Sequence, residues 1–258
     1  EKLKSLSQSV ISKKCPFNFC DGSGKKIDRE RNTVIICGCA SKTKTKKLFF
    51  SQIPEAFKGL TVNSFDAKRY IDDESIRVAS KAKASAVNYI KQFKSFKEIG
   101  KGLYLYSATK GCGKTRLAAS IGNALITTYG SDVKFLNTIK LLNEIKETYN
   151  SDSRLSENRL LESVYNIEIL ILDDLGVEVP KDWVNQIFYS ILNERLNRRK
   201  VTIFTSNTMI EDLKYDDRII SRIEAMAVPV FLPDRSVRKA IAEEENRVLQ
   251  LSLWGIEN

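Results

Sequence analysis

Residues 108–115 read Ala-Thr-Lys-Gly-Cys-Gly-Lys-Thr and lie between an apolar run, residues 102–107, and a helix-like run, residues 116–125. This order of strand, glycine-rich turn and helix is the context of a phosphate-binding loop. Backbone N–H groups in such a turn converge on phosphate oxygens, and the N-terminus of the following helix adds its positive dipole end. We therefore expect polyphosphate binding, with Lys114 reaching the terminal phosphates and the Thr115 hydroxyl coordinating Mg²⁺.

The loop departs from the usual pattern at one position, because Ala108 stands where the first glycine is expected. This change removes no ligand group, and Gly111 and Gly113 remain at the tightest part of the turn. The alternative is a glycine-rich loop that binds nothing. If the loop binds phosphate, the remaining residues of the predicted binding set are Thr109, Lys110, Cys112 and Arg116.

A second set of polar residues follows an apolar run and a further predicted buried strand along the chain. Residues 169–172 are Ile-Leu-Ile-Leu and lead into Asp173 and Asp174, and residues 201–205 lead to Asn207. Unbroken apolar runs fit strands buried on both faces of a parallel sheet, and ligands of such sheets bind beyond the carboxyl ends of the strands. We expect Asp173 to hold Mg²⁺, Asp174 to polarise an attacking water, and Asn207 to orient that water. Each pattern taken alone is also common at ordinary strand ends.

Two pairs of arginines close the set of candidate residues. Residues 216–226 predict a helix on which Arg218 and Arg222, four residues apart, share one exposed face. These arginines either pair with nearby acids or provide an arginine finger that enters the site of a neighbouring subunit. Arg235 and Arg238 stand at the start of the last helix, where either one can reach the γ-phosphate bound by its own subunit.

Four of the five cysteines lie in the first 40 residues, with the spacing C-x4-C, sixteen residues, then C-x-C. Turn-forming residues flank each pair, which lets four thiolates converge on one tetrahedral ion. A hairpin strand at residues 32–36 between the pairs would complete a small zinc-binding domain that the metal stabilises. Two disulfides or four free thiols are the alternatives. The predicted zinc ligands are Cys15, Cys20, Cys37 and Cys39.

The amino-acid composition excludes some classes of mechanism and suggests the kind of partner. The 258 residues include no histidine, which excludes every mechanism that needs a histidine base or metal ligand. The net charge is +10, and residues 1–50 carry 12 Lys/Arg against 4 Asp/Glu, so the basic excess is concentrated there. Such an excess fits a nucleic-acid partner, an acidic protein partner or a solvated tail. No apolar run is long enough to span a bilayer and no secretory signal is visible, so we expect a cytoplasmic protein.

Together, these residues resemble the AAA+ ATPases and, within them, the bacterial replicative-helicase loaders of the DnaC/DnaI type with their IstB-like relatives. The resemblance runs from about residue 53 to residue 238, and its most specific part is residues 141–176. The Asp-Asp-Leu-Gly ending of that part, residues 173–176, resembles the loaders more than other AAA+ proteins. It implies a three-layer αβα P-loop module with a reduced C-terminal lid over residues 51–258, behind a zinc-binding domain over residues 1–50. It also implies Mg²⁺-dependent, slow ATP hydrolysis that depends on assembly.

The resemblance assigns roles and partners as well. It implies Arg222 as the finger, Asn207 as first sensor and an arginine of the last helix as second sensor, where Arg238 fits slightly better than Arg235. Head-to-tail self-association or co-assembly with a related loader, ATP or ADP as ligand, and a replicative hexameric helicase as partner follow from it. The predicted single-stranded DNA contacts are Lys146, Tyr149, Lys181 and Trp183.

The sequence leaves three functions open. Each of them is compatible with a phage-encoded member of the family. The first is loading of a replicative helicase onto single-stranded DNA. The second is a transposition ATPase of the IstB kind, against which the cysteine-rich segment argues. The third is a protein that binds and inhibits a host helicase loader, which the short N-terminal domain and Ala108 motivate.

Overall fold

The structure is a computed structural model of the chain, and it describes residues 25–28, 33–36, 45–150 and 154–253. The chain divides into two compact units, Glu1–Phe49 and Phe50–Asn258. In the first unit, β1 (Lys25–Asp28) pairs antiparallel with β2 (Thr33–Ile36), which confirms the predicted hairpin strand. The four cysteines predicted to bind zinc lie outside the described residues.

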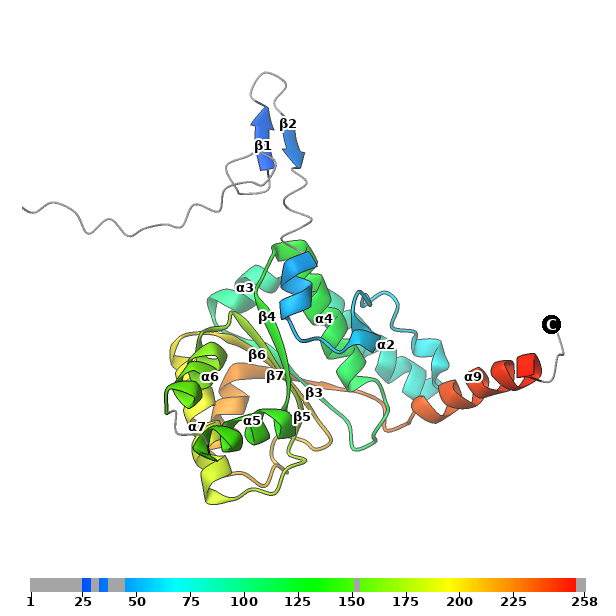
Figure 1. The fold of residues 1–258 in the computed structure, drawn as a ribbon. Coiled ribbons are helices and arrows are strands. Elements are labelled where there is room, and N and C mark those ends of the chain that lie inside the picture. The colour runs from blue at the N-terminus through cyan, green and yellow to red at the C-terminus, as the bar shows by residue number, and fades with distance from the viewer. Residues whose placement is uncertain (1–24, 29–32, 37–44, 151–153, 254–258) are drawn as a thin grey trace, which may run out of the picture. The chain divides into compact units, whose positions relative to one another are not determined.

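The second unit is built on a five-stranded parallel sheet (Figure 1) with strand order β4-β5-β6-β3-β7. Its three central strands, β3, β5 and β6, are buried almost throughout, which is why their sequences are mostly apolar and do not alternate with exposed polar residues. The parallel α/β class predicted from these runs is confirmed. The strands are β3 (Gly102–Tyr106), β4 (Val133–Asn137), β5 (Ile169–Leu175), β6 (Val201–Ser206) and β7 (Ala227–Phe231).

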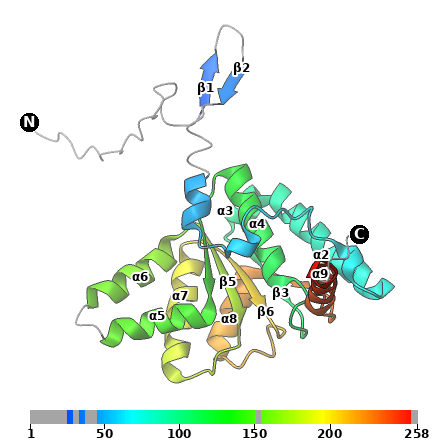
Figure 2. The same cartoon turned by 45° about the vertical axis from the view of Figure 1, so that its right-hand side comes forward.

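Helices cover both faces of this sheet, and Figures 1 and 2 show α2 and α4 on one side and α5, α6 and α7 on the other. Among the described residues, α9 is the helix that follows the last strand. No described helix is both long and apolar enough to cross a membrane. The helices are η1 (Glu55–Phe57), η2 (Ala67–Arg69), α2 (Asp73–Lys91), α3 (Phe93–Glu98), α4 (Lys114–Tyr129), α5 (Thr138–Asn150), α6 (Arg154–Asn166), α7 (Asp182–Asn197), α8 (Asp217–Met226) and α9 (Arg238–Leu253).

One charged side chain, Arg195 of α7, lies fully buried in this unit. Its guanidinium donates to the carbonyl oxygens of Val164 (2.6 Å), Ile167 (3.0 Å) and Val201 (2.6 Å), and to Thr202 Oγ1 (3.0 Å). Burial lowers the pKa of this guanidinium to about 9, so it remains charged at neutral pH. These bonds fasten α6 and α7 to the beginning of β6, at the end of the strand opposite the polar residues 205–207.

The strand register brings the predicted polar residues to one edge. Tyr106 of β3 pairs with Ser206 of β6, while β5 runs alongside β6 on its other side. The two aspartates lie near the carboxyl end of β5, as the sequence predicted, and the strand continues one residue further, to Leu175. The pairing with β6 is interrupted between Leu172 and Leu175, where Asp174 adopts a left-handed backbone with φ of 59°.

Candidate functional site

A cleft of about 440 Å³ opens beside the loop between β3 and α4. Its volume lies within the range typical of sites for small ligands. Aromatic rings from the segment before α2 form one part of its lining, contributed by Phe57, Phe65 and Tyr70. The predicted site residues in its lining are Lys110, Gly111, Gly113, Lys114, Thr115, Arg116, Asp174, Asn207 and Arg238.

The two glycines of the loop have the backbone conformation that a phosphate-binding turn requires. Gly111 and Gly113 have φ of 80° and 97°, a region that residues with a Cβ seldom adopt. A Cβ on Gly113 would also lie 2.9 Å from Phe65 Cε2. Gly113 precedes the first residue of α4 and gives this helix no side-chain cap. The N-terminal N–H groups of α4 are therefore suited to an anion, as the sequence predicted.

Lys114 is buried, and its ammonium is held by the loop itself. The Nζ atom donates to the carbonyl oxygens of Thr109 (2.9 Å) and Ser107 (3.2 Å), and it lies 3.5 Å from Cys112 Sγ. These acceptors carry no formal charge. The positive charge therefore stands at the cleft, positioned for a polyanion and held there by weaker, neutral partners.

Asp173 lies behind the cleft lining and is also buried. Burial raises the pKa of its carboxyl to about 6, although a hydrogen bond from Thr205 (Oγ1 to Oδ1, 2.7 Å) opposes that rise. The Thr115 hydroxyl and Lys114 also favour the ionised form, which places both close to this carboxylate. A carboxylate beside a hydroxyl is an oxygen donor set of the kind Mg²⁺ takes when water and phosphate oxygens supply the rest.

The described residues contain no group of three or more His, Cys, Asp or Glu side chains placed to hold a metal ion by themselves. Thr115 and Asp173 would therefore hold Mg²⁺ only as part of a site completed by a ligand. Asn207 and Asp174 face the same cleft, as the assignment of water-orienting and water-polarising roles requires.

The two arginines near the start of the last helix are separated by the structure. Arg238 lines the cleft, whereas Arg235 Nε lies 3.6 Å from Asp72 Oδ2 at the start of α2. The side chain of Arg235 is 72% exposed. The geometry therefore favours Arg238 as the second sensor. Arg116, also in the cleft lining, donates from Nη2 to the carbonyl oxygen of Ser64 (2.7 Å).

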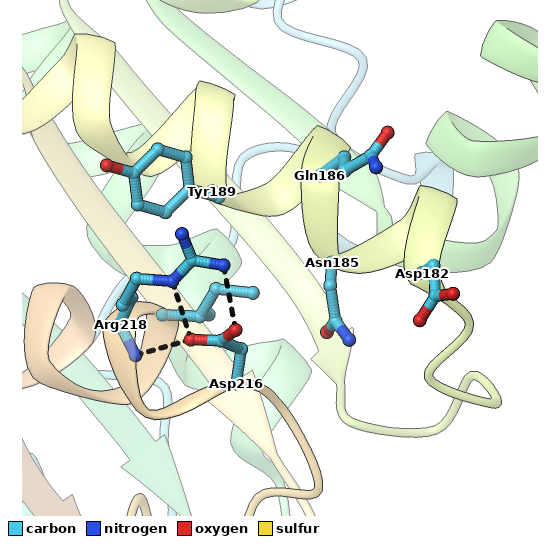
Figure 3. A pocket seen from close by; sticks show the side chains of 7 residues that line it. Asp182, Asn185, Gln186, Tyr189, Asp216 and Arg218 are labelled. Carbon is cyan, nitrogen blue, oxygen red and sulfur yellow. Dashed lines mark hydrogen bonds and ion pairs between the residues drawn. The ribbon is translucent and has the colours of Figure 1, made fainter.

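Arg218 and Arg222 lie on a different surface, over α7. Arg218 makes a two-pronged ion pair with Asp216 beneath the ring of Tyr189 (Figure 3), so for this arginine the pairing alternative is the one observed. Arg222 instead stacks on Tyr189, with 4.2 Å from its Cζ to the ring centroid. It donates to Asn193 Oδ1 (2.9 and 3.1 Å) and to Tyr189 Oη (3.0 Å). Half-buried Arg222 is thus oriented by neutral groups.

The predicted DNA contacts have mixed surroundings. Lys146 of α5 and Lys181, just before α7, are exposed. Trp183 is half-buried and packs against the core between the sheet and α7. Tyr149 lies in α5, and its side chain is outside the described residues.

Sequence reasoning missed three residues that build this site. Thr205 holds Asp173, Tyr70 donates its hydroxyl proton to the carbonyl oxygen of Cys112 (2.5 Å), and Asp234 accepts from the N–H of Ala108 (2.8 Å). The position of Thr205 just before Asn207 was the one available signal. The contact of Tyr70 spans 42 positions of the sequence and that of Asp234 spans 126, so no local sequence pattern could predict them.

The cost of burying Asp173 predicts a stabilising substitution. The folded pKa of about 6 lies above the ordinary 3.8, so the carboxylate destabilises the fold at pH values above 6. That cost fades as the pH falls from 6 toward 4. We expect Asp173→Asn to raise the free energy of unfolding at pH 7 by about 3 kcal/mol, because about two pKa units, each worth about 1.4 kcal/mol, separate the folded and unfolded states. Urea unfolding at pH 7 and pH 4.5 measures this difference.

Asp174→Asn is the matched control, since asparagine tolerates the left-handed backbone at that position. It should leave the free energy of unfolding within about 0.5 kcal/mol of the parent. A destabilised Asp173→Asn protein at pH 7, or a gain equal at both pH values, would show that Asp173 is not held at the expense of stability.

The protein family that matches this chain is described as ATP-binding, which agrees with the phosphate-binding loop beside the cleft. The IstB-like ATP binding protein family matches residues 55–223. The replicative helicase loader DnaC of Buchnera aphidicola subsp. Baizongia pistaciae is 30% identical over 149 residues, which are 57% of each chain. The chain thus spans under two thirds of the length of the curated relatives it matches.

Two solved structures share the fold. The DnaC helicase loader superposes with a TM-score of 0.60 at 23% identity, covering 70% of this chain and all of that one. DnaI superposes with a TM-score of 0.58 at 25% identity, covering 75% of this chain and all of that one. The family match spans more than half of the sequence and includes the phosphate-binding loop and the paired aspartates. This chain therefore belongs to the IstB-like ATP-binding protein family.

Proposed function

We propose that this protein is an ATP-dependent loader of a replicative hexameric helicase onto single-stranded DNA. The main support is a cleft lined by a phosphate-binding loop, Asp174 and a sensor-like asparagine, with the buried Asp173 behind it, in a chain similar to proteins named helicase loaders. In this proposal the loop N–H groups and Lys114 bind the triphosphate, and Thr115 and Asp173 hold Mg²⁺. The metal would supply Lewis-acid stabilisation of the phosphates.

The remaining residues of the cleft have complementary tasks in this proposal. Asp174 accepts a proton from the attacking water, Asn207 orients it, and Arg238 reads the γ-phosphate. Hydrolysis is slow in an isolated subunit because Arg222 lies over α7 on its own subunit and acts on the site of its neighbour. Such a head-to-tail contact repeats into a ring or an open spiral.

Co-purification with candidate replicative helicases, with and without ATP, tests the central proposal. We expect a helicase to be retained in the presence of ATP. Once loaded on a single-stranded DNA circle, that helicase should displace an oligonucleotide annealed to the circle. Lys114→Ala should bind the helicase weakly and fail to load it, because it lacks the cation that the triphosphate needs. Capture of a helicase without loading, or inhibition of a cognate loader, would contradict loading and identify an inhibitor instead.

The finger assignment has its own test. We expect Arg222→Ala to bind nucleotide normally but to lose about a hundredfold or more of the DNA-stimulated ATPase rate, since it removes a transition-state charge partner. Mixing it with Lys114→Ala subunits, which keep Arg222, should restore part of that rate. Arg218→Ala is the matched control, because Arg218 is already paired with Asp216. Full activity of Arg222→Ala would remove the finger from the mechanism.

Contacts with single-stranded DNA are a further part of the proposal. Lys146 and Lys181 would neutralise phosphates, and Tyr149 and Trp183 would stack on bases without regard to sequence. Trp183 is the sharpest test because it also packs against the core. Unchanged affinity of Trp183→Ala for oligo-dT would assign that side chain to packing alone.

For the N-terminal unit we propose a structural zinc ion bound by Cys15, Cys20, Cys37 and Cys39. The support is their spacing and the β1–β2 hairpin between the two pairs. Metal analysis of reduced protein should find about one zinc per chain, since four thiolates complete a structural site. Cys37→Ser should lose the zinc and Cys112→Ser, in the other unit, should keep it. Zinc-free parent protein would exclude the site.

A further inference from the structure

The segment between β7 and α9 is bonded to the phosphate-binding loop along its length. The Leu232 N–H donates to the carbonyl oxygen of Tyr106 (2.8 Å), and the Val237 N–H donates to that of Gly111 (3.1 Å). Between these two bonds, Asp234 Oδ1 accepts from the N–H of Ala108 (2.8 Å). The loop and the start of α9 are therefore one connected structure.

Ser107 strengthens the same junction. Its hydroxyl is fully buried and lies 2.8 Å from Asp234 Oδ1 and 3.0 Å from the carbonyl oxygen of Pro233. The N–H of Thr109 donates to that hydroxyl oxygen (3.2 Å). One carboxylate oxygen thus fixes Ala108 directly and Thr109 through Ser107. Hydrogen bonds to an ionised acceptor are about twice as strong as neutral ones.

This junction also gives the unusual Ala108 a physical explanation. Ala108 is not among the residues with positive φ, so its backbone needs no glycine. Its N–H is directed to a carboxylate of this chain rather than into the cleft. Gly111, by contrast, cannot take a side chain, because a Cβ there would lie 2.6 Å from Ser236 Oγ and 3.0 Å from Arg238 Cβ. The loop is shaped to fit against the beginning of α9.

The contacts from Asp234 to residues 107–109 are important because of Lys114. In the structure its ammonium bonds to the carbonyl oxygens of Ser107 and Thr109. If Lys114 engages a phosphate, it gives up those two bonds, and the segment 107–109 loses its support from inside the loop. The contacts of Asp234 with the Ser107 hydroxyl and the Ala108 N–H do not involve Lys114 and remain available.

We propose that Asp234 is a positioning residue. It keeps residues 107–109 in their phosphate-binding shape and transmits nucleotide occupancy of the cleft to α9, the helix that carries Arg238, Ile241 and Glu245 into the cleft lining. This inference rests on the part of the proposed function that places nucleotide in the cleft, and it does not depend on helicase loading.

Two measurements on the full chain test the inference. Titration of a fluorescent ADP analogue with Mg²⁺ gives the dissociation constant. Hydrogen exchange of peptides from residues 238–253, with and without saturating ADP, reports the ordering of α9. Asp234→Ala should weaken binding about tenfold, because it leaves the Ala108 N–H and the Ser107 hydroxyl without their charged acceptor. It should also abolish the ADP-dependent protection of α9 even at saturation.

Asp234→Asn separates a positioning role from a charge effect. Its amide oxygen can accept the same two hydrogen bonds, so it should restore α9 protection. It should also bind ADP at least as tightly as the parent, since a negative charge near the phosphates is removed. Asp212→Ala, an exposed acid outside the cleft lining, is the control and should match the parent in both measurements. Ser107→Ala should change both in the same direction as Asp234→Ala and by less, which keeps the test usable if Asp234→Ala does not fold.

The outcomes are distinct. Parental affinity and parental α9 protection in Asp234→Ala would overturn the inference. An Asp234→Asn protein as impaired as Asp234→Ala would overturn the acceptor role, and protection retained by Asp234→Ala at saturation would overturn the coupling. A parent protein that binds no ADP would instead bring down the cleft assignment itself.

Discussion

The parallel register of β3, β5 and β6 is the constraint on which the site depends. It places Ser107, Asp173 and Ser206 at one edge of the sheet, although they come from three distant parts of the chain. Short bonds then join neighbouring strands at this edge: Thr205 Oγ1 to Asp173 Oδ1 (2.7 Å) and Ser206 Oγ to the carbonyl oxygen of Leu175 (2.7 Å). At the opposite end, buried Arg195 ties β6 to α6 and α7. If one of these strands changed its register relative to its neighbours, the phosphate-binding loop would be separated from the carboxylates.

Much of this arrangement follows from local sequence, because local backbone geometry dictates it. Gly111 and Gly113 must be glycines at positive φ, and the helix that begins at Lys114 must start where the turn ends. Residues 169–172 are apolar throughout, and residues 201–205 are apolar except for the buried Thr202 and Thr205, because both faces of the strands are covered. Ligands of parallel sheets bind beyond the carboxyl ends of the strands, so Asp173 and Asn207, which follow these runs, were predictable candidates.

The remainder of the site was not predictable, because it consists of contacts between polar residues far apart in the sequence. Tyr70 and Asp234 lie in segments with no periodicity that points to the loop, yet both bond to it. The continuation of β5 to Leu175 depends on pairing with β6, and the sequence of β5 alone does not contain that information. Likewise, the surroundings of Arg222 come from α7, whose Tyr189 and Asn193 carried no signal of their own.

Two buried ionisable groups give the cleft its character. The buried ammonium of Lys114 donates to neutral carbonyl oxygens, and burial raises the pKa of Asp173 to about 6. Neither arrangement favours the fold by itself, because a buried charge without a full opposite partner costs free energy. Each becomes favourable when a ligand brings an anion to Lys114 and a cation to Asp173, which is the charge pattern of a nucleotide with a bound divalent metal. The same free energy that destabilises the unliganded cleft therefore favours binding, and the contacts of Asp234 with the loop limit how far the structure can relax to avoid that cost.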